Sequence, residues 1–129
     1  MTMRLAILIT PLLLILNSCT TYKPAPPQEL FKNGESDHHT YRIPSLVTTK
    51  DGTLLAFAEG RVNGSGDSGD INLVIRRSED GGHTWSDNKV IWDDGANVCG
   101  NPTPVVLDNG DIVLLLTWGH GKELSLIHI

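Results

Sequence analysis

The stretch Ser78-Glu79-Asp80-Gly81-Gly82-His83-Thr84-Trp85 decides the fold, because it places a tight turn between two apolar runs. The run before it, Ile71 to Arg77, has isoleucine or leucine at every second position, which is the period of a half-buried β-strand. Asp80-Gly81-Gly82 supplies residues that favour a turn. The run after it, Thr84 to Asp93, predicts the next strand or strand pair.

Two more turns extend this pattern in both directions. Each combines Asp or Asn with Gly between aliphatic runs, which is typical of a β-hairpin. They are Lys50-Asp51-Gly52, between expected strands 42–49 and 53–58, and Asp108-Asn109-Gly110, between 104–107 and 111–118. The two turns lie 58 residues apart. The segments 59–70 and 94–101 are expected to be loops.

About six short strands joined by tight turns, without helical periodicity, predict an antiparallel all-β architecture. This pattern does not separate a sandwich from a barrel or a propeller. A single repeat interval is too little evidence to decide between them.

Composition limits the classes of partner. The 129-residue chain has a net charge of −5, and removing residues 1–18, whose only charge is Arg4, makes it −6. No cluster of Lys and Arg interrupts this acidic balance, which argues against a nucleic acid partner. Residues 31–123, about 90 in number, are enough for a small domain by length.

Residues 1–18 resemble a bacterial lipoprotein signal. Arg4 precedes an almost unbroken aliphatic run from Leu5 to Leu16, which is shorter than the ~20 residues of a bilayer span. The boundary ending in Cys19 is similar to a lipobox, so Cys19 is the expected lipidation site, with ordinary signal-peptidase cleavage nearby as the alternative. We expect export across the bacterial inner membrane and a lipid-anchored protein in the periplasm or at the cell surface. Cys99 is then the only other thiol, and no disulfide forms within the chain.

Two further segments, residues 19–30 and 124–129, are expected to lie outside the folded domain. Residues 19–30 contain Pro24, Pro26 and Pro27 without apolar periodicity, which predicts an extended tether. Residues 124–129, Leu-Ser-Leu-Ile-His-Ile, match what one reading frame of a common transposon-based sequencing adaptor encodes. We therefore expect the native sequence to stop near Glu123. The alternative is a genuine strand, which re-sequencing of the locus would reveal.

Two arginines are expected at one rim of the sheet. Arg42 begins a strand beside Pro44, which marks a strand end or an edge strand because proline cannot donate to the ladder. Arg61 ends the neighbouring strand, so the turn at 50–52 can bring both guanidinium groups together. Converging arginines can bind a carboxylate through planar, charge-assisted hydrogen bonds. The alternative is that each pairs with a surface acid such as Glu59 or Glu79.

A glycine-rich loop follows Arg61 and carries two carboxyl groups, Asp67 and Asp70. A loop of small residues can bring a carboxyl close to a substrate, and a general acid is a carboxyl kept protonated by burial or by nearby negative charge. Both aspartates qualify by type. Turn capping by either is the alternative.

The run Tyr41-Arg42-Ile43-Pro44, followed by the S-x-D-x-G-x-T-W box at 78–85, resembles the opening of the sialidase (neuraminidase) family. In that family an arginine-bearing strand precedes the first Asp box. The resemblance covers residues 31–118, and its elements occur in family order. It implies that residues 31–123 are the N-terminal portion, about two blades, of a six-bladed β-propeller.

The resemblance also implies roles for single residues. The arginine of the family's Y/F-R-I-P motif is the first of three that bind the sialic acid carboxylate, and it matches Arg42. The second matches Arg61, and the acid/base aspartate in the next loop matches Asp67. Asp70 matches a structural position. The segment Asn101-Pro102-Thr103 is similar to the family's N/D-P-x segment, so Asn101 is expected to contact the O4 and N-acetyl side of the sugar.

The Asp box itself is expected to be structural and remote from the active site. Its characteristic residues are Ser78, Asp80, Gly82 and Trp85. The resemblance implies that Asp80 binds turn amides and that Trp85 packs beneath the turn. The family uses no metal in catalysis, and we expect neither a metal nor a cofactor here. His38, His39 and His83 are therefore expected to be loop or core residues.

The function implied by the resemblance is that of an exo-α-sialidase acting on sialylated glycoconjugates. The family's tyrosine nucleophile, its glutamate partner and its third arginine are expected downstream of this chain, which by itself should be inactive. One alternative is a non-catalytic propeller that binds sialic acid or another glycan. Another is a structural Asp-box propeller of unrelated role.

Overall fold

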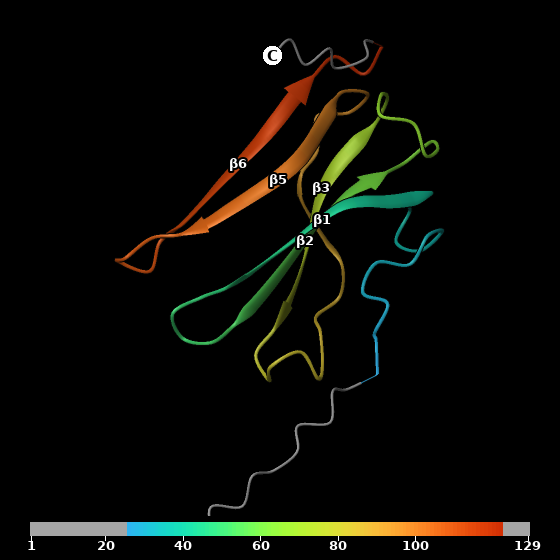
Figure 1. Cartoon of the computed structure of the whole chain (residues 1–129). Coiled ribbons are helices and arrows are strands. Elements are labelled where there is room, and N and C mark those ends of the chain that lie inside the picture. Colours follow the sequence, from blue (N-terminus) through green and yellow to red (C-terminus); the bar gives the residue numbers. More distant parts are fainter. Residues whose placement is uncertain (1–25, 123–129) are drawn as a thin grey trace, which may run out of the picture.

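The computed structural model describes residues 26–122, which form six β-strands and no helix (Figure 1). The strands are β1 (Thr40–Thr48), β2 (Leu54–Arg61), β3 (Ile71–Ser78), β4 (Lys89–Trp92), β5 (Val98–Val106) and β6 (Ile112–Gly119). The predicted all-β fold class is confirmed. The signal segment 1–18, Cys19, most of the tether 19–30 and the tail 124–129 lie outside the described residues.

The sheet has two parts that share one end. β1, β2 and β3 form an antiparallel meander, and β4 pairs antiparallel with β3. β5 and β6 form a second antiparallel hairpin, which joins β3 through a single parallel bridge between Ile71 and Val98. Away from this bridge the second hairpin diverges from β1–β3 (Figure 1).

The hairpins β1–β2 and β5–β6 are built alike, with an offset of 58 residues. Their turns contain Gly52 and Gly110, whose φ values of 86° and 93° are open to glycine at little cost. Both pairings are interrupted by a bulge, between residues 42 and 45 in one and 100 and 103 in the other. Inside the bulges Ile43 and Asn101 take left-handed φ values of 52° and 53°. The sequence interval between the turns is therefore a structural repeat.

The core lies around β2, the strand between β1 and β3. All of β2 from Leu55 to Arg61 is buried; β1 and β3 pair with its two edges, and β5 also packs against it. The buried apolar side chains come from β2, β3 and the start of β5; they are Leu55, Ala56, Phe57, Ala58, Ile71, Leu73, Val74, Val98 and Cys99. By contrast, β4 and much of β6 are exposed.

Two predicted segments are wrong in their boundaries. Residues 84–88 were expected in a strand, but they have no regular secondary structure and β4 covers only Lys89–Trp92. Residues 94–101 were expected to be loop, but β5 begins at Val98 and includes Asn101. The composition Gly100-Asn101-Pro102 is typical of a turn, and a bulge accommodates it within the strand instead.

Candidate active site

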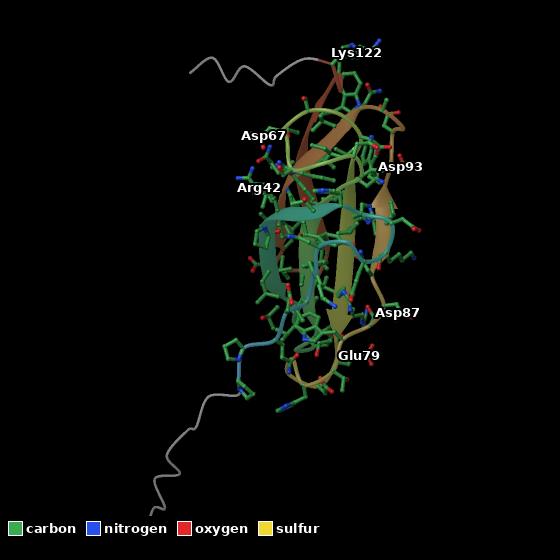
Figure 2. The ribbon with its side chains drawn as sticks, turned by 90° about the vertical axis from the view of Figure 1, so that its right-hand side faces the viewer. Arg42, Asp67, Glu79, Asp87, Asp93 and Lys122 are labelled. Atoms are coloured by element: carbon green, nitrogen blue, oxygen red, sulfur yellow. The ribbon has the colours of Figure 1, made fainter. Side chains whose placement is uncertain are left out.

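The expected site residues lie where β1 begins and β2 ends. Arg42 pairs across the hairpin with Glu59, and Arg61 pairs with Thr40. A backbone hydrogen bond closes the loop after β2 at its base: the Val62 N–H donates to the carbonyl oxygen of Asp70 at 3.0 Å. Figure 2 shows Arg42 and Asp67 close together at one end of the sheet.

Arg42 is positioned by the bulge in β1. Ile43 is in the left-handed region, which a β-branched residue rarely adopts, and Pro44 follows it. The side chain of Arg42 is about half exposed, at 49%. Its Nη1 donates to Asp67 Oδ1 at 3.2 Å, the one polar contact of this guanidinium within residues 26–122. The other donors of Arg42 are thus open to a bound anion.

Arg61 differs, because only 3% of its side chain is exposed. Its Nε and Nη2 donate to Glu59 Oε2 at 3.0 and 2.6 Å. Its Nη1 donates to the carbonyl oxygens of Ser65 and Gly66 at 2.6 and 2.8 Å, and it lies 2.8 Å from Asp67 Oδ1. The pairing with Glu59 that sequence reasoning held as an alternative is therefore present, in the interior. These bonds occupy four of the five guanidinium N–H groups and fix the loop.

Asp67 joins the two arginines while remaining accessible. Its Oδ1 lies 3.2 Å from Arg42 Nη1 and 2.8 Å from Arg61 Nη1, and 68% of its side chain is exposed. Such a carboxyl can accept or give a proton at the surface of a bound ligand. The structure thus brings three of the expected site residues into one cluster.

Asp70, the other carboxyl of the loop, lies apart from this cluster. Burial raises its pKa above the usual value, the negative charge of Asp93 adds to the rise, and His38 opposes it. That direction suits a general acid. However, Asp70 has no hydrogen bond to Arg42 or Arg61, and its Oδ1 has no partner within residues 26–122. Geometry therefore favours Asp67 as the carboxyl beside the arginines.

Asn101 reaches the same cluster from β5. Its backbone N–H donates to Glu59 Oε1 at 3.0 Å, and its Nδ2 donates to Thr117 Oγ1 at 2.8 Å. Its φ of 53° belongs to a region that asparagine tolerates better than most residues. The side chain is exposed, and its Oδ1 is left to accept a hydrogen bond from a ligand.

Glu59 is the residue whose importance the sequence analysis missed. Only 3% of it is exposed, yet both of its carboxylate oxygens are used. The signal was its spacing from Arg61, because residues two apart on a strand lie on the same face. Burial of that face could not be read from the short apolar run around it.

The Asp box lies at the opposite end of β2 and β3, where Leu54 pairs with Ser78. The Asp80 carboxylate accepts hydrogen bonds from Thr84 Oγ1 at 2.6 Å, Thr84 N–H at 2.9 Å and Ser78 Oγ at 2.8 Å. Trp85 Nε1 donates to Gly82 O at 3.1 Å and closes the turn. Glu79, in this box, appears far from Arg42 and Asp67 in Figure 2.

The histidines lie elsewhere. His38 is 4% exposed, with its Nδ1 3.2 Å from Tyr41 Oη and its Nε2 3.4 Å from Asn72 Nδ2. Across residues 26–122 no three His, Cys, Asp or Glu side chains converge in a way that could hold a metal ion. The same residues include no helix long and apolar enough to cross a membrane.

A family profile and a solved structure identify the class of protein to which this chain is similar. The sequence profile of the BNR repeat-like domain family matches residues 43–125, more than half of the chain. The solved structure of "Hadza microbial sialidase Hz136" is similar with a TM-score of 0.62 and 31% sequence identity, over 71% of this chain and 20% of that chain. The strands are therefore part of a β-propeller of the sialidase type, with β1–β4 as one four-stranded blade and β5–β6 as two strands of the next.

The curated proteins that are similar in sequence to this chain include sialidases. An exo-alpha-sialidase of Aspergillus fumigatus is 43% identical over 86 residues, covering 62% of this chain and 21% of the fungal protein. A sialidase of Paraclostridium sordellii is 36% identical over 104 residues, covering 77% of this chain and 26% of that protein. The chain belongs to the BNR repeat-like family, and these two relatives are sialidases. It spans about a fifth to a quarter of the length of these relatives.

Proposed function

We propose that the complete protein is an exo-α-sialidase, which releases terminal sialic acid from glycoconjugates. The observation that carries this proposal is the meeting of Arg42 and Asp67 at one exposed rim, 3.2 Å apart, in a chain whose relatives are sialidases. An open arginine provides a ligand for the sugar carboxylate. The carboxyl beside it provides a proton once that substrate carboxylate has displaced it from Arg42, because the negative charge of the sugar then favours its protonated form. Both groups are needed to cleave a sialoside.

The contact between Arg42 and Asp67 suggests the order of events. The Asp67 carboxylate occupies one N–H of Arg42 Nη1, and a substrate carboxylate that binds both Nη groups of this guanidinium would need that position as well. Two carboxylates compete there, so binding of the sugar would displace Asp67 from Arg42. Arg61, buried behind the loop, would keep hold of Asp67 and limit how far it moves. The freed carboxyl would then lie beside the sugar and near its glycosidic oxygen.

In this mechanism Asp67 protonates the leaving oxygen and later deprotonates the attacking water, with retention of configuration. Sialidases use a tyrosine nucleophile instead of a carboxylate. A carboxylate would be repelled by the acid group on the anomeric carbon. Tyr41, the one tyrosine within residues 26–122, has its hydroxyl bound to Glu35 O at 2.9 Å and to Asn88 Nδ2 at 2.8 Å. Tyr22, the other tyrosine of the sequence, belongs to the tether expected for residues 19–30. The proposal therefore takes its nucleophile from sequence beyond this chain.

Arg61 and Asn101, the other two expected site residues, would assist substrate binding. Arg61 would add positive charge beneath the substrate carboxylate, and its one remaining Nη2–H could donate a hydrogen bond. Asn101 would offer its Oδ1 to the O4 and N-acetyl side of the sugar. Lipid anchoring at Cys19 would hold the enzyme at a membrane surface without any other membrane contact.

An aryl α-sialoside tests the proposal. The complete gene product should release sialic acid from it at about pH 4 to 8, the range in which a carboxyl acid/base operates. Calorimetric titration with free sialic acid separates the alternatives. Binding without hydrolysis would support a non-catalytic glycan-binding propeller, and neither binding nor hydrolysis would leave a structural propeller.

A further inference from the structure

Glu59 connects two parts of the site that are far apart in sequence. Its Oε2 accepts both the Nε–H and an Nη2–H of Arg61, at 3.0 and 2.6 Å. Its Oε1 accepts the backbone N–H of Asn101, 42 residues away, at 3.0 Å. One buried carboxylate therefore spans from the first hairpin to the second.

The second hairpin is shaped around this carboxylate. A Cβ at Gly100 would fall on Glu59 Oε1, so the position accepts no side chain while Glu59 stays in place. The next residue, Asn101, has a left-handed backbone whose N–H points at the same oxygen. A strained backbone of this kind persists where surrounding contacts fix it. Glu59 supplies such a contact.

Arg61, which Glu59 holds in place, in turn binds the loop that carries Asp67. Its Nη1 binds the carbonyl oxygens of Ser65 and Gly66, the two residues before Asp67, and also contacts the Asp67 carboxylate. A buried guanidinium needs a compensating charge, and Glu59 is the buried one. Without it, Arg61 would be free to draw Asp67 inward or to leave the loop.

We propose that Glu59 is a positioning residue, which sets the places of Asp67 through Arg61 and of Asn101 through its backbone N–H. This inference rests on the proposed sialidase function. It assigns no contact between Glu59 and substrate. Its effect is on geometry, and displacements of about 1 Å can lower rates by about 10²-fold.

Two substitutions test it in the complete protein. Glu59→Gln has one oxygen and one NH2 group, so it must face either Arg61 or Asn101 donor to donor. Gly100→Ala leaves every charge in place but forces Glu59 Oε1 to move. Matched controls are Glu79→Gln, which breaks an exposed pair with Arg77, and Gly119→Ala, whose added Cβ meets nothing within 4 Å.

The readout is kcat and KM on a natural sialoside and on an activated aryl sialoside. We expect both variants to lower kcat on the natural sialoside by about tenfold or more, since its poor leaving group depends on a placed proton donor. The aryl sialoside should lose less, KM should change less than kcat, and both controls should match the unmutated enzyme. If the Glu59→Gln variant does not fold, the kcat values of the Gly100→Ala variant on the two sialosides test the inference.

The opposing outcomes are distinct. Unchanged kcat in both variants of an active enzyme overturns the inference, and so do equal losses on the two substrates, which would give Glu59 a general structural role. An unmutated protein without sialidase activity overturns the proposed function, and the inference with it.

Discussion

One oxygen atom, Oδ1 of Asp67, lies within reach of two arginines that have very different surroundings. Arg42 is half exposed and has a single partner, whereas Arg61 is buried and has most of its donors occupied. This difference in exposure and in free donors suggests different roles for the two arginines. In the proposed mechanism, Arg42 is the group that a substrate reaches, whereas Arg61 binds the loop through the carbonyl oxygens of Ser65 and Gly66.

Arg42→Lys should impair the enzyme although it keeps the charge. An ammonium group cannot reproduce the planar fork of a guanidinium on a carboxylate. Losing one charge-assisted hydrogen bond, worth about 1.5–3 kcal/mol, should lower kcat/KM by about 10- to 100-fold. Steady-state kinetics on an aryl sialoside measure this. Arg77→Lys, at an exposed pair with Glu79, is the control. Near-normal activity of the Arg42 variant would make Arg42 a packing residue.

Asp67→Ala should reduce activity according to the leaving group. General acid catalysis contributes about 10²- to 10⁴-fold, and a natural sialoside depends on it more than an activated aryl sialoside. The measurement compares kcat/KM on the two substrates. Asp70→Ala is the control from the same loop and should show no such selectivity. Should Asp70→Ala show the selective loss instead, the acid role moves to Asp70.

At the scale of elements, turns organise the sheet, and the Asp box is the most strongly bonded of them. Hydrogen bonds from Thr84 and Ser78 hold the pKa of Asp80 well below its usual value of 3.8. A carboxyl whose pKa is depressed by folding stabilises the folded state above the unfolded pKa. That stability is lost as the pH falls below about 4 towards the lower folded pKa.

Asp80→Asn in the complete protein should therefore lower the unfolding temperature clearly at pH 7 and less at about pH 2.5, where the carboxyl of the unfolded chain is already protonated and the ionised carboxylate of the folded chain stabilises the fold less. Thermal unfolding at the two pH values measures the difference. Asp87→Asn, at an exposed carboxyl in the segment after the turn, is the control. A penalty that is the same at both pH values would mean that the ionised form of Asp80 does not stabilise the turn.

The elements that the sequence predicted well are those whose signals are local. Turns such as Asp108-Asn109-Gly110 and the alternating run of β3 depend on residues close in the chain. β5 was predicted too short because its bulge uses Gly, Asn and Pro, which are common in loops. The parallel bridge between β3 and β5 and the burial of Glu59 depend on distant segments, and no local pattern reveals them.

At the scale of the whole molecule, β1 and β6 are the outer strands of the path through the sheet. Large apolar side chains on both are open to solvent, with Leu46 59% and Leu115 61% exposed. Exposed edges that carry apolar side chains favour association with other chains. In a closed propeller, neighbouring blades would cover these faces.

The 129-residue chain by itself should therefore self-associate and hydrolyse no sialoside. Light scattering after size-exclusion chromatography measures the first property. Leu46→Lys should reduce association more than Thr48→Lys, which adds the same charge to the same strand without removing an exposed apolar side chain. A monomer with sharp cooperative unfolding would show that these strands form an independent domain.

The contact between Glu59 and Gly100 has a consequence for how such blades can diverge. The two positions belong to different hairpins, but an acid at one leaves no room for a side chain at the other. Replacing the acid by a smaller residue would open space beside Asn101 for a new group at the rim. Positions 59 and 100 are therefore expected to change together among relatives, as paired substitutions in two different hairpins.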